Sequence, residues 1–129
     1  MKKIFTFKKR KDFLRVAQQH YVATHNVVVQ AARSLYEGDD IYVGYTATKK
    51  VGNAVIRSKA KRRLRAIIRE ILFKYAINGV DYVFIARNST ATCDFSELKK
   101  DTIYAIKKLN KNFIDEPILE KDVPDEKNS

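Results

Sequence analysis

The sequence predicts a single α+β domain, and three observations lead to this prediction. The chain has 129 residues, of which 45% are hydrophobic, so it has material for one core rather than two. Short runs rich in valine and aromatic residues, typical of strands, are interspersed with longer segments whose apolar residues recur at helical spacing. Along the chain the predicted order is helix, three strands, long helix, strand and helix, with the four strands in one sheet.

The N-terminal part contains one predicted helix and three predicted strands. In residues 9–19, a narrow apolar stripe at helical spacing is formed by Phe13, Val16 and Ala17. Extended segments follow at residues 21–25, 27–32 and 41–47. In the last of these, residues alternate between one face, Ile41, Val43, Tyr45 and Ala47, and another, Tyr42, Gly44 and Thr46. This alternation predicts a strand half-buried against a layer of helices.

The C-terminal part contains the two longest predicted helices. In residues 57–76 a helical stripe must face a core; it comprises Ala60, Leu64, Ile67, Ile68, Ile71, Leu72, Tyr75 and Ala76. Asn78-Gly79 is predicted to end this helix, because glycine readily adopts the left-handed conformation. Residues 81–86 predict a central strand. Asp94 is the predicted N-cap of a helix over residues 95–113, with a buried stripe of Phe95, Leu98, Thr102, Ala105, Ile106, Leu109 and Phe113.

The charge of the chain is large and unevenly distributed. The net charge is +11, but residues 115–129 hold six acids and two lysines, so residues 1–114 have a net charge of +15. Such a surplus repels itself, and a polyanionic partner is the usual reason to carry it. We therefore predict a nucleic-acid-binding domain over residues 1–114, followed by an acidic, mobile tail over residues 115–129.

Residues 49–74 concentrate the positive charge, with ten basic residues and one acid, Glu70. A stripe about three turns long is formed by Ser58, Arg62, Arg65 and Arg69, at i, i+4, i+7 and i+11. Arginine offers a planar fork of donors that can hold phosphate oxygens with two hydrogen bonds. Solvated helix faces usually mix glutamate with lysine, so this stripe favours a structured RNA backbone over plain solvation.

The loop before this helix contains Gly52 and Asn53. Gly52 permits close backbone approach, and Asn53 can cap the helix. The loop is no Walker motif, because the second glycine and the Gly-Lys-Ser/Thr ending are missing. A single cysteine, Cys93, excludes an internal disulfide and suits a reducing cytoplasm. No apolar run is long enough for a membrane span, so we expect a cytoplasmic protein without membrane contact.

The segment KKVGNAVIRSKAKRRLRAIIRE, residues 49–70, resembles the characteristic motif of the bacterial ribonuclease P protein subunit. FLRV near the start and DYVFIAR after the long helix are also similar to that family, and the resemblance covers roughly residues 5–113. It implies an αβββαβα fold like a ribosomal-protein domain, with a left-handed β-α-β crossover around the long helix. General handedness rules predict a right-handed crossover between parallel neighbours, and we follow the more specific resemblance.

The resemblance also implies a function. Ribonuclease P is the RNA-based endoribonuclease that removes the 5′ leader of precursor tRNA, and its protein subunit binds the catalytic RNA and the leader. The active site and its Mg²⁺ belong mainly to the RNA subunit and substrate, so we expect no catalytic or metal-binding residue in this chain, which we expect to be monomeric. In agreement, the sequence shows no carboxylate cluster suited to two-metal hydrolysis. His20 and His25 are five residues apart on an extended stretch, so we expect them on opposite faces of the sheet rather than as a catalytic pair.

Two sets of residues are the expected contacts. The RNA-binding residues implied by the motif are Lys49, Lys50, Asn53, Arg57, Ser58, Lys59, Lys61, Arg62, Arg65 and Arg69. The leader is expected in a cleft between the first helix and the sheet, formed by Phe13, Ala17, Val28 and Gln30. The family often has aromatic residues at positions 17 and 30, so we expect leader binding here to rely more on charge, through Lys49, Lys50 and Arg57.

The motif departs from the family pattern at one place. The family's Arg-Asn-Arg is Arg57-Ser58-Lys59 here, and lysine cannot form a bidentate fork. Two alternatives to the ribonuclease P interpretation are a non-enzymatic binder of structured or ribosomal RNA, and a peripheral membrane protein with a basic amphipathic helix. The membrane alternative is the weakest, because the apolar face lacks tryptophan and is flanked by strands. Stimulation of a ribonuclease P RNA at low Mg²⁺ separates the first two.

Overall fold

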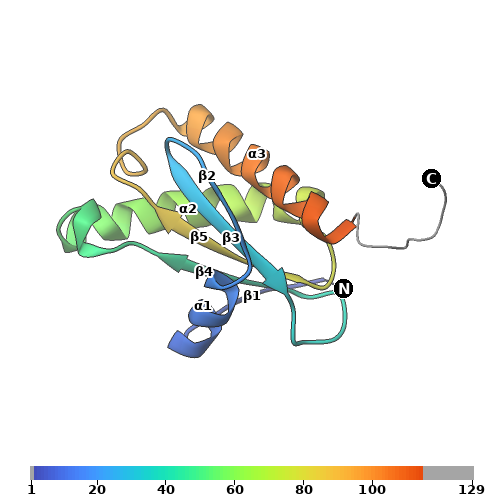
Figure 1. Cartoon of the computed structure of the whole chain (residues 1–129). Helices are drawn as coiled ribbons and strands as arrows, with labels where there is room; N and C mark the ends of the chain where they lie inside the picture. The colour runs from blue at the N-terminus through green and yellow to red at the C-terminus, as the bar shows by residue number, and fades with distance from the viewer. Residues whose placement is uncertain (1, 115–129) are drawn as a thin grey trace.

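The computed structural model describes residues 2–114 (Figure 1). Its elements are, in order, β1 Ile4–Thr6, α1 Arg10–Ala17, β2 His20–Ala23, β3 Val27–Arg33, β4 Ile41–Thr46, the 3₁₀ turn η1 Lys49–Val51, α2 Ala54–Tyr75, β5 Val80–Ala86 and α3 Phe95–Ile114. The predicted acidic tail, residues 115–129, lies outside the described residues. None of the helices in residues 2–114 has the length and apolar character needed to cross a membrane.

The strands form one mixed sheet with the order β1-β4-β5-β3-β2. β4 pairs in parallel with both β1 and β5, whereas the β5–β3 and β3–β2 pairs are antiparallel. The predicted α+β class is confirmed, and β5 lies at the centre of the sheet as predicted. The prediction of four strands is wrong by one, because Ile4–Thr6 adds an edge strand that is too short for its alternation to be recognised.

The helix α2 connects β4 to its parallel neighbour β5. The two strands joined by the long helix are therefore parallel neighbours, as a β-α-β crossover requires. The hand of the connection stays a prediction, left-handed from the family resemblance and right-handed from the general rule.

Helices cover the two faces of the sheet unequally (Figure 1). The long helices α2 and α3 lie on one face, where α2 packs on β4 and β5 and α3 packs on β2 and β3. The short helix α1 lies on the other face, over β3 and β5. The main core is between the sheet and the two long helices, and a smaller cluster under α1 comprises Phe7, Val16, Ala32 and Val83.

The ends of α2 differ from the predicted ones for local reasons. The helix begins at Ala54, because Asn53 caps it: its Oδ1 accepts a hydrogen bond of 3.0 Å from the Ile56 N–H. The helix ends at Tyr75, before Asn78-Gly79, because Ala76 is already extended. Gly79 does have a left-handed φ of 82°, but it shapes the turn into β5 rather than the helix end.

The predicted buried stripe of α3 is confirmed except at its first residue. Phe95 is 39% exposed, whereas the other six residues are buried. Asp94 caps the helix as predicted, since its Oδ1 accepts from the Ser96 N–H at 3.4 Å. Phe95 stays at the surface because it lies in the first turn, where the Arg63 guanidinium covers its ring at 5.6 Å.

Candidate RNA-binding surface

The loop between β4 and α2 is built around Gly52. Its φ is 151°, and a Cβ atom there would lie 2.9 Å from Cγ2 of Ile56, so a larger residue is disfavoured by both backbone and space. This turn places Asn53 at the start of α2 and leaves Lys49 and Lys50 exposed just before it. The Asn53 amide oxygen is engaged by the helix, so the amide nitrogen is its atom for an external ligand.

The predicted arginine stripe is exposed along α2. Ser58, Arg62, Arg65 and Arg69 all face solvent, on the side away from the buried Leu64. Within residues 2–114, the two ion pairs that form, Arg15–Asp81 and Lys99–Glu70, do not include the stripe. The three guanidinium groups therefore keep their charge for an external anion. Of the remaining predicted contacts, Lys59 is exposed, and Arg57 and Lys61 are half-buried beside the stripe.

Arg65 lies over an aromatic ring of the sheet. Its guanidinium is 5.3 Å from the Tyr45 ring centre, a distance suited to a cation–π contact. Burial raises the pKa of Tyr45 to about 12, and the charges of Arg65 and Arg69 only partly oppose this effect. The ring is therefore a neutral phenol at physiological pH, and it orients Arg65 without neutralising its charge.

Arg63 shows that one basic residue of α2 has a structural role. Its two terminal nitrogens donate hydrogen bonds of 2.6 Å to the carbonyl oxygens of Thr90 and Cys93. These hydrogen bonds connect α2 to the loop that leads into α3. In the same loop, burial raises the pKa of the Cys93 thiol, which disfavours the reactive thiolate form.

A groove of about 460 Å³ opens between α1 and the sheet. Three of the predicted leader-cleft residues line it together, namely Phe13, Ala17 and Gln30. Val28 is not among the lining residues, although its partner across the strands, Ile85, is one of them. Lining residues that the sequence did not predict are Lys8, Arg10, Leu14, Tyr45, Thr46, Val83 and Ile85.

Gly44 lets Phe13 lie directly on the sheet. A Cβ atom at Gly44 would be 2.5 Å from Cε1 of the Phe13 ring, closer than real contacts allow. The alternation of residues 41–47 had already put Gly44 and Thr46 on the face opposite the main core. That pattern could have identified both residues as part of this groove, because the expected cleft lies between the first helix and the face of the sheet that points away from the main core.

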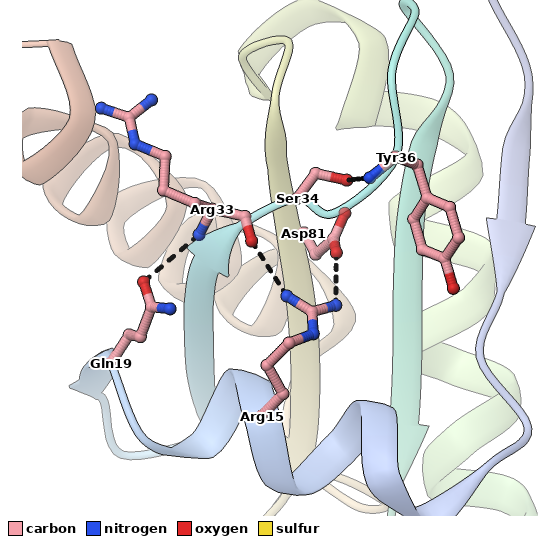
Figure 2. A network of polar contacts seen from close by, with 6 residues as sticks. All are labelled: Arg15, Gln19, Arg33, Ser34, Tyr36 and Asp81. Carbon is pink, nitrogen blue, oxygen red and sulfur yellow. Dashed lines mark hydrogen bonds and ion pairs between the residues drawn. The ribbon is translucent and has the colours of Figure 1, made fainter.

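α1 is fastened to the sheet by a polar network around Arg15 (Figure 2). Its guanidinium donates 2.7 Å and 2.9 Å hydrogen bonds to Asp81 Oδ2 and to the Arg33 carbonyl oxygen. Asp81 is fully buried, and this burial raises the pKa of its carboxyl group, whereas Arg15 opposes the rise. Gln19 accepts from the Arg33 N–H at 3.3 Å. The network holds the wall of the groove in place, a role that the sequence did not reveal for Arg15.

A second hollow, about 320 Å³, lies near the loop before α2. It brings Lys50 together with His25, Arg87 and Ser89, so it is a basic pocket at the end of the sheet. His20 is elsewhere, with its ring edge-on to Phe113 at 5.4 Å, and the two histidines form no pair. Within residues 2–114, no three side chains of His, Cys, Asp or Glu gather as metal ligands.

An exposed arginine stripe, a basic pocket and a groove containing an aromatic ring define an RNA-binding α+β protein. Residues 1–110 match the family described as Ribonuclease P. The chain is 43% identical to the ribonuclease P protein component of Ruegeria pomeroyi, over 83% of this chain and 87% of that one. It is 40% identical to the same component of Paramagnetospirillum magneticum, over 79% and 80% of the two chains.

Solved structures agree with these relatives. The Staphylococcus aureus RNase P protein superimposes with a TM-score of 0.68 at 29% identity, over 81% of this chain and 94% of that one. The Thermotoga maritima protein shares the fold, with a TM-score of 0.68 over 80% and 96% of the chains. The chain therefore belongs to the ribonuclease P protein family, the accessory subunits of the ribonucleoprotein enzyme that cleaves the leader from precursor tRNA.

Proposed function

We propose that α2 binds the RNA subunit of ribonuclease P and that the groove under α1 holds the 5′ leader of precursor tRNA. The observation that carries this proposal is the row of three exposed arginines, Arg62, Arg65 and Arg69, without a carboxylate partner among the described residues. A rigid helix keeps their donor forks at constant spacing, which suits the phosphates of a folded RNA.

The groove supports the second half of the proposal. It offers the rings of Phe13 and Tyr45 for stacking and the cations Lys8 and Arg10 for phosphates, the combination that binds unpaired nucleotides. Ala17 and Gln30 add no ring at the two positions where the family often has one. Leader binding therefore depends strongly on charge, including Lys49, Lys50 and Arg57, and its affinity should fall as salt rises.

Bond cleavage is proposed to take place in the RNA subunit, with Mg²⁺ held mainly by that RNA and the substrate. The donor set of the protein does not fit a two-metal site, because no three candidate ligands come together within residues 2–114. The protein residues act by binding and orienting the two RNAs. We further propose a monomer in the cytoplasm, a reducing compartment that suits the free thiol of Cys93.

The test is stimulation of leader removal by a bacterial ribonuclease P RNA at low Mg²⁺. The wild-type protein should stimulate, and the double variant Arg62→Ala/Arg65→Ala should not, with an unchanged melting temperature. A matched control is Lys107→Ala/Lys108→Ala, which removes the same charge from exposed positions of α3. Equal loss in both double variants would show that net charge alone matters. Failure of the wild-type protein would favour a non-enzymatic RNA-binding protein.

A further inference from the structure

Beyond the groove, aromatic rings form a continuous chain across the α1 face of the sheet. Phe13, in the groove, meets Phe7 edge-on at 6.1 Å, and Phe7 lies 6.4 Å from Tyr42. Tyr42 is in turn stacked with Phe5 at 5.4 Å and with Tyr36 at 4.1 Å. The rings come from β1, the loop after it, α1, β4 and the loop before β4, so the chain of rings exists only in the folded protein.

The outer end of this chain is exposed to solvent. Phe5 and Tyr36 are each 43% exposed, whereas Phe7 is 7% exposed. Scattered exposed apolar residues are ordinary on a protein surface, but these two rings adjoin a third, Tyr42, and together form a patch. We call Phe5, Tyr36 and Tyr42 the edge patch. Figure 2 shows the Tyr36 ring beside β4, close to the edge of the sheet.

Cations surround the edge patch. A hollow of about 340 Å³ is lined by its three rings and by Lys8, Lys9, Lys11 and Asp12. The charged side chains of this lining sum to a positive charge, with three lysines against one carboxylate. Exposed rings beside lysines match single-stranded nucleic acid, because bases stack on the rings and phosphates meet the cations. Lysine is depleted in protein–protein interfaces, which disfavours a protein partner.

The edge patch is continuous with the groove. Lys8 lines both hollows. Along β4 and η1, Tyr42 lines the outer hollow, Thr46 lines the groove, and Lys50 lines the basic pocket beside α2. The three sites therefore follow one another in chain order, and the edge patch is at the end farthest from the arginine stripe in this order.

We propose that the edge patch binds an unpaired leader nucleotide farther from the cleavage site than the nucleotides in the groove. This inference rests on the proposed function of the groove. The leader leaves the groove past Lys8, one of its bases stacks on Tyr36 or Phe5, and its phosphates contact Lys9 and Lys11. The protein thus distinguishes precursors by leader length as well as by the presence of a leader.

The experiment measures Kd of the reconstituted holoenzyme for precursor tRNAs whose leaders are lengthened one nucleotide at a time. Wild-type affinity should rise in a second step once the leader reaches past the groove. The double variant Phe5→Ala/Tyr36→Ala should remove this step, a loss of at least about 5-fold for long leaders, and leave short leaders unchanged. Tyr36→Phe should retain the step. The matched control is Tyr104→Ala, which removes a ring that is 55% exposed on α3.

The possible failures are distinguishable. Equal losses for short and long leaders would show a merely structural role and overturn the proposal. If Phe13→Ala weakens leader binding but the edge-patch variants do not at any length, the groove stands and the edge patch fails. If a leader of any length leaves the affinity of the wild-type holoenzyme for precursor tRNA unchanged, the proposed function of the groove fails as well. A change in sedimentation of the edge-patch variants would assign the patch to self-association and overturn it too.

Discussion

The two faces of the sheet use the same strands for opposite purposes. On one face, α2 and α3 close over the alternate side chains of every central strand, and residues such as Val29, Tyr82 and Phe84 are fully buried. On the other face, α1 is the only described helix over the intervening residues, which also meet Phe7 from the loop after β1. There Gln30, Val83 and Ile85 line a groove rather than a closed core.

The difference follows from helix length. α2 has 22 residues, about 33 Å, whereas α1 has 8 residues, about 12 Å. A long helix buries a continuous stripe, and a short one covers only part of the strands beneath it. We infer that the closed face supplies most of the stability and that the half-covered face is available for a ligand. The following predictions test this division, from the largest expected effect to the smallest.

Leucines on the two faces should respond differently to truncation. Leu64→Ala, at a fully buried site under α2, should lower the free energy of unfolding by about 2–5 kcal/mol, because a cavity remains. Leu14→Ala, at a groove residue that is 49% exposed, should change it by no more than about 0.5 kcal/mol but weaken leader binding. Denaturant unfolding measures the stability of both variants, and the Kd for precursor tRNA with and without a leader measures leader binding. Similar destabilisation by both would contradict the division.

Gly44→Ala should disturb the half-covered face alone. The new methyl group would meet the Phe13 ring, and overpacking of this kind costs about 1–3 kcal/mol. Leader affinity should fall because Phe13 is displaced from the groove. The control is a double-mutant cycle with Phe13→Ala, which makes room for the methyl group, so the two stability effects should be less than additive. Strict additivity would mean that the residues are not in contact.

The Asp81 carboxyl group should give the smallest effect, seen only as a pH dependence. Burial raises its folded-state pKa above the usual value of 3.8, so the folded protein holds the proton more strongly than the unfolded chain does. Asp81 therefore adds stability that is fully present below pH 3.8 and is lost as pH rises through the folded pKa. Denaturant unfolding at several pH values should show that the free energy of unfolding of the wild type rises relative to that of Asp81→Asn as pH falls through this window. The opposite trend would show that Arg15 outweighs burial.

Several parts of the fold were predictable from the sequence because they depend on local spacing. The alternation of residues 41–47 assigned both faces of β4 correctly, and helical spacing identified the buried side of α2 and its exposed arginines. Parts that depend on distant partners were not predictable. β1 is three residues long and forms only because β4 is there to pair with it, and the end of α2 follows from Ala76 rather than from the nearby glycine.

The same distinction between local spacing and distant contacts applies to the candidate site. The sequence by itself determined the basic helix, its capping residue Asn53 and the position of Phe13 on a short amphipathic helix. Only the tertiary structure decided that Arg63 bonds to a loop while Arg62 faces solvent, and that Arg15 holds α1 on Asp81. It also decided that rings from β1, β4 and the loop before β4 meet at the edge of the sheet. Helix and strand geometry dictate which residues of one element share a face. Contacts between elements depend on register and packing across the whole core.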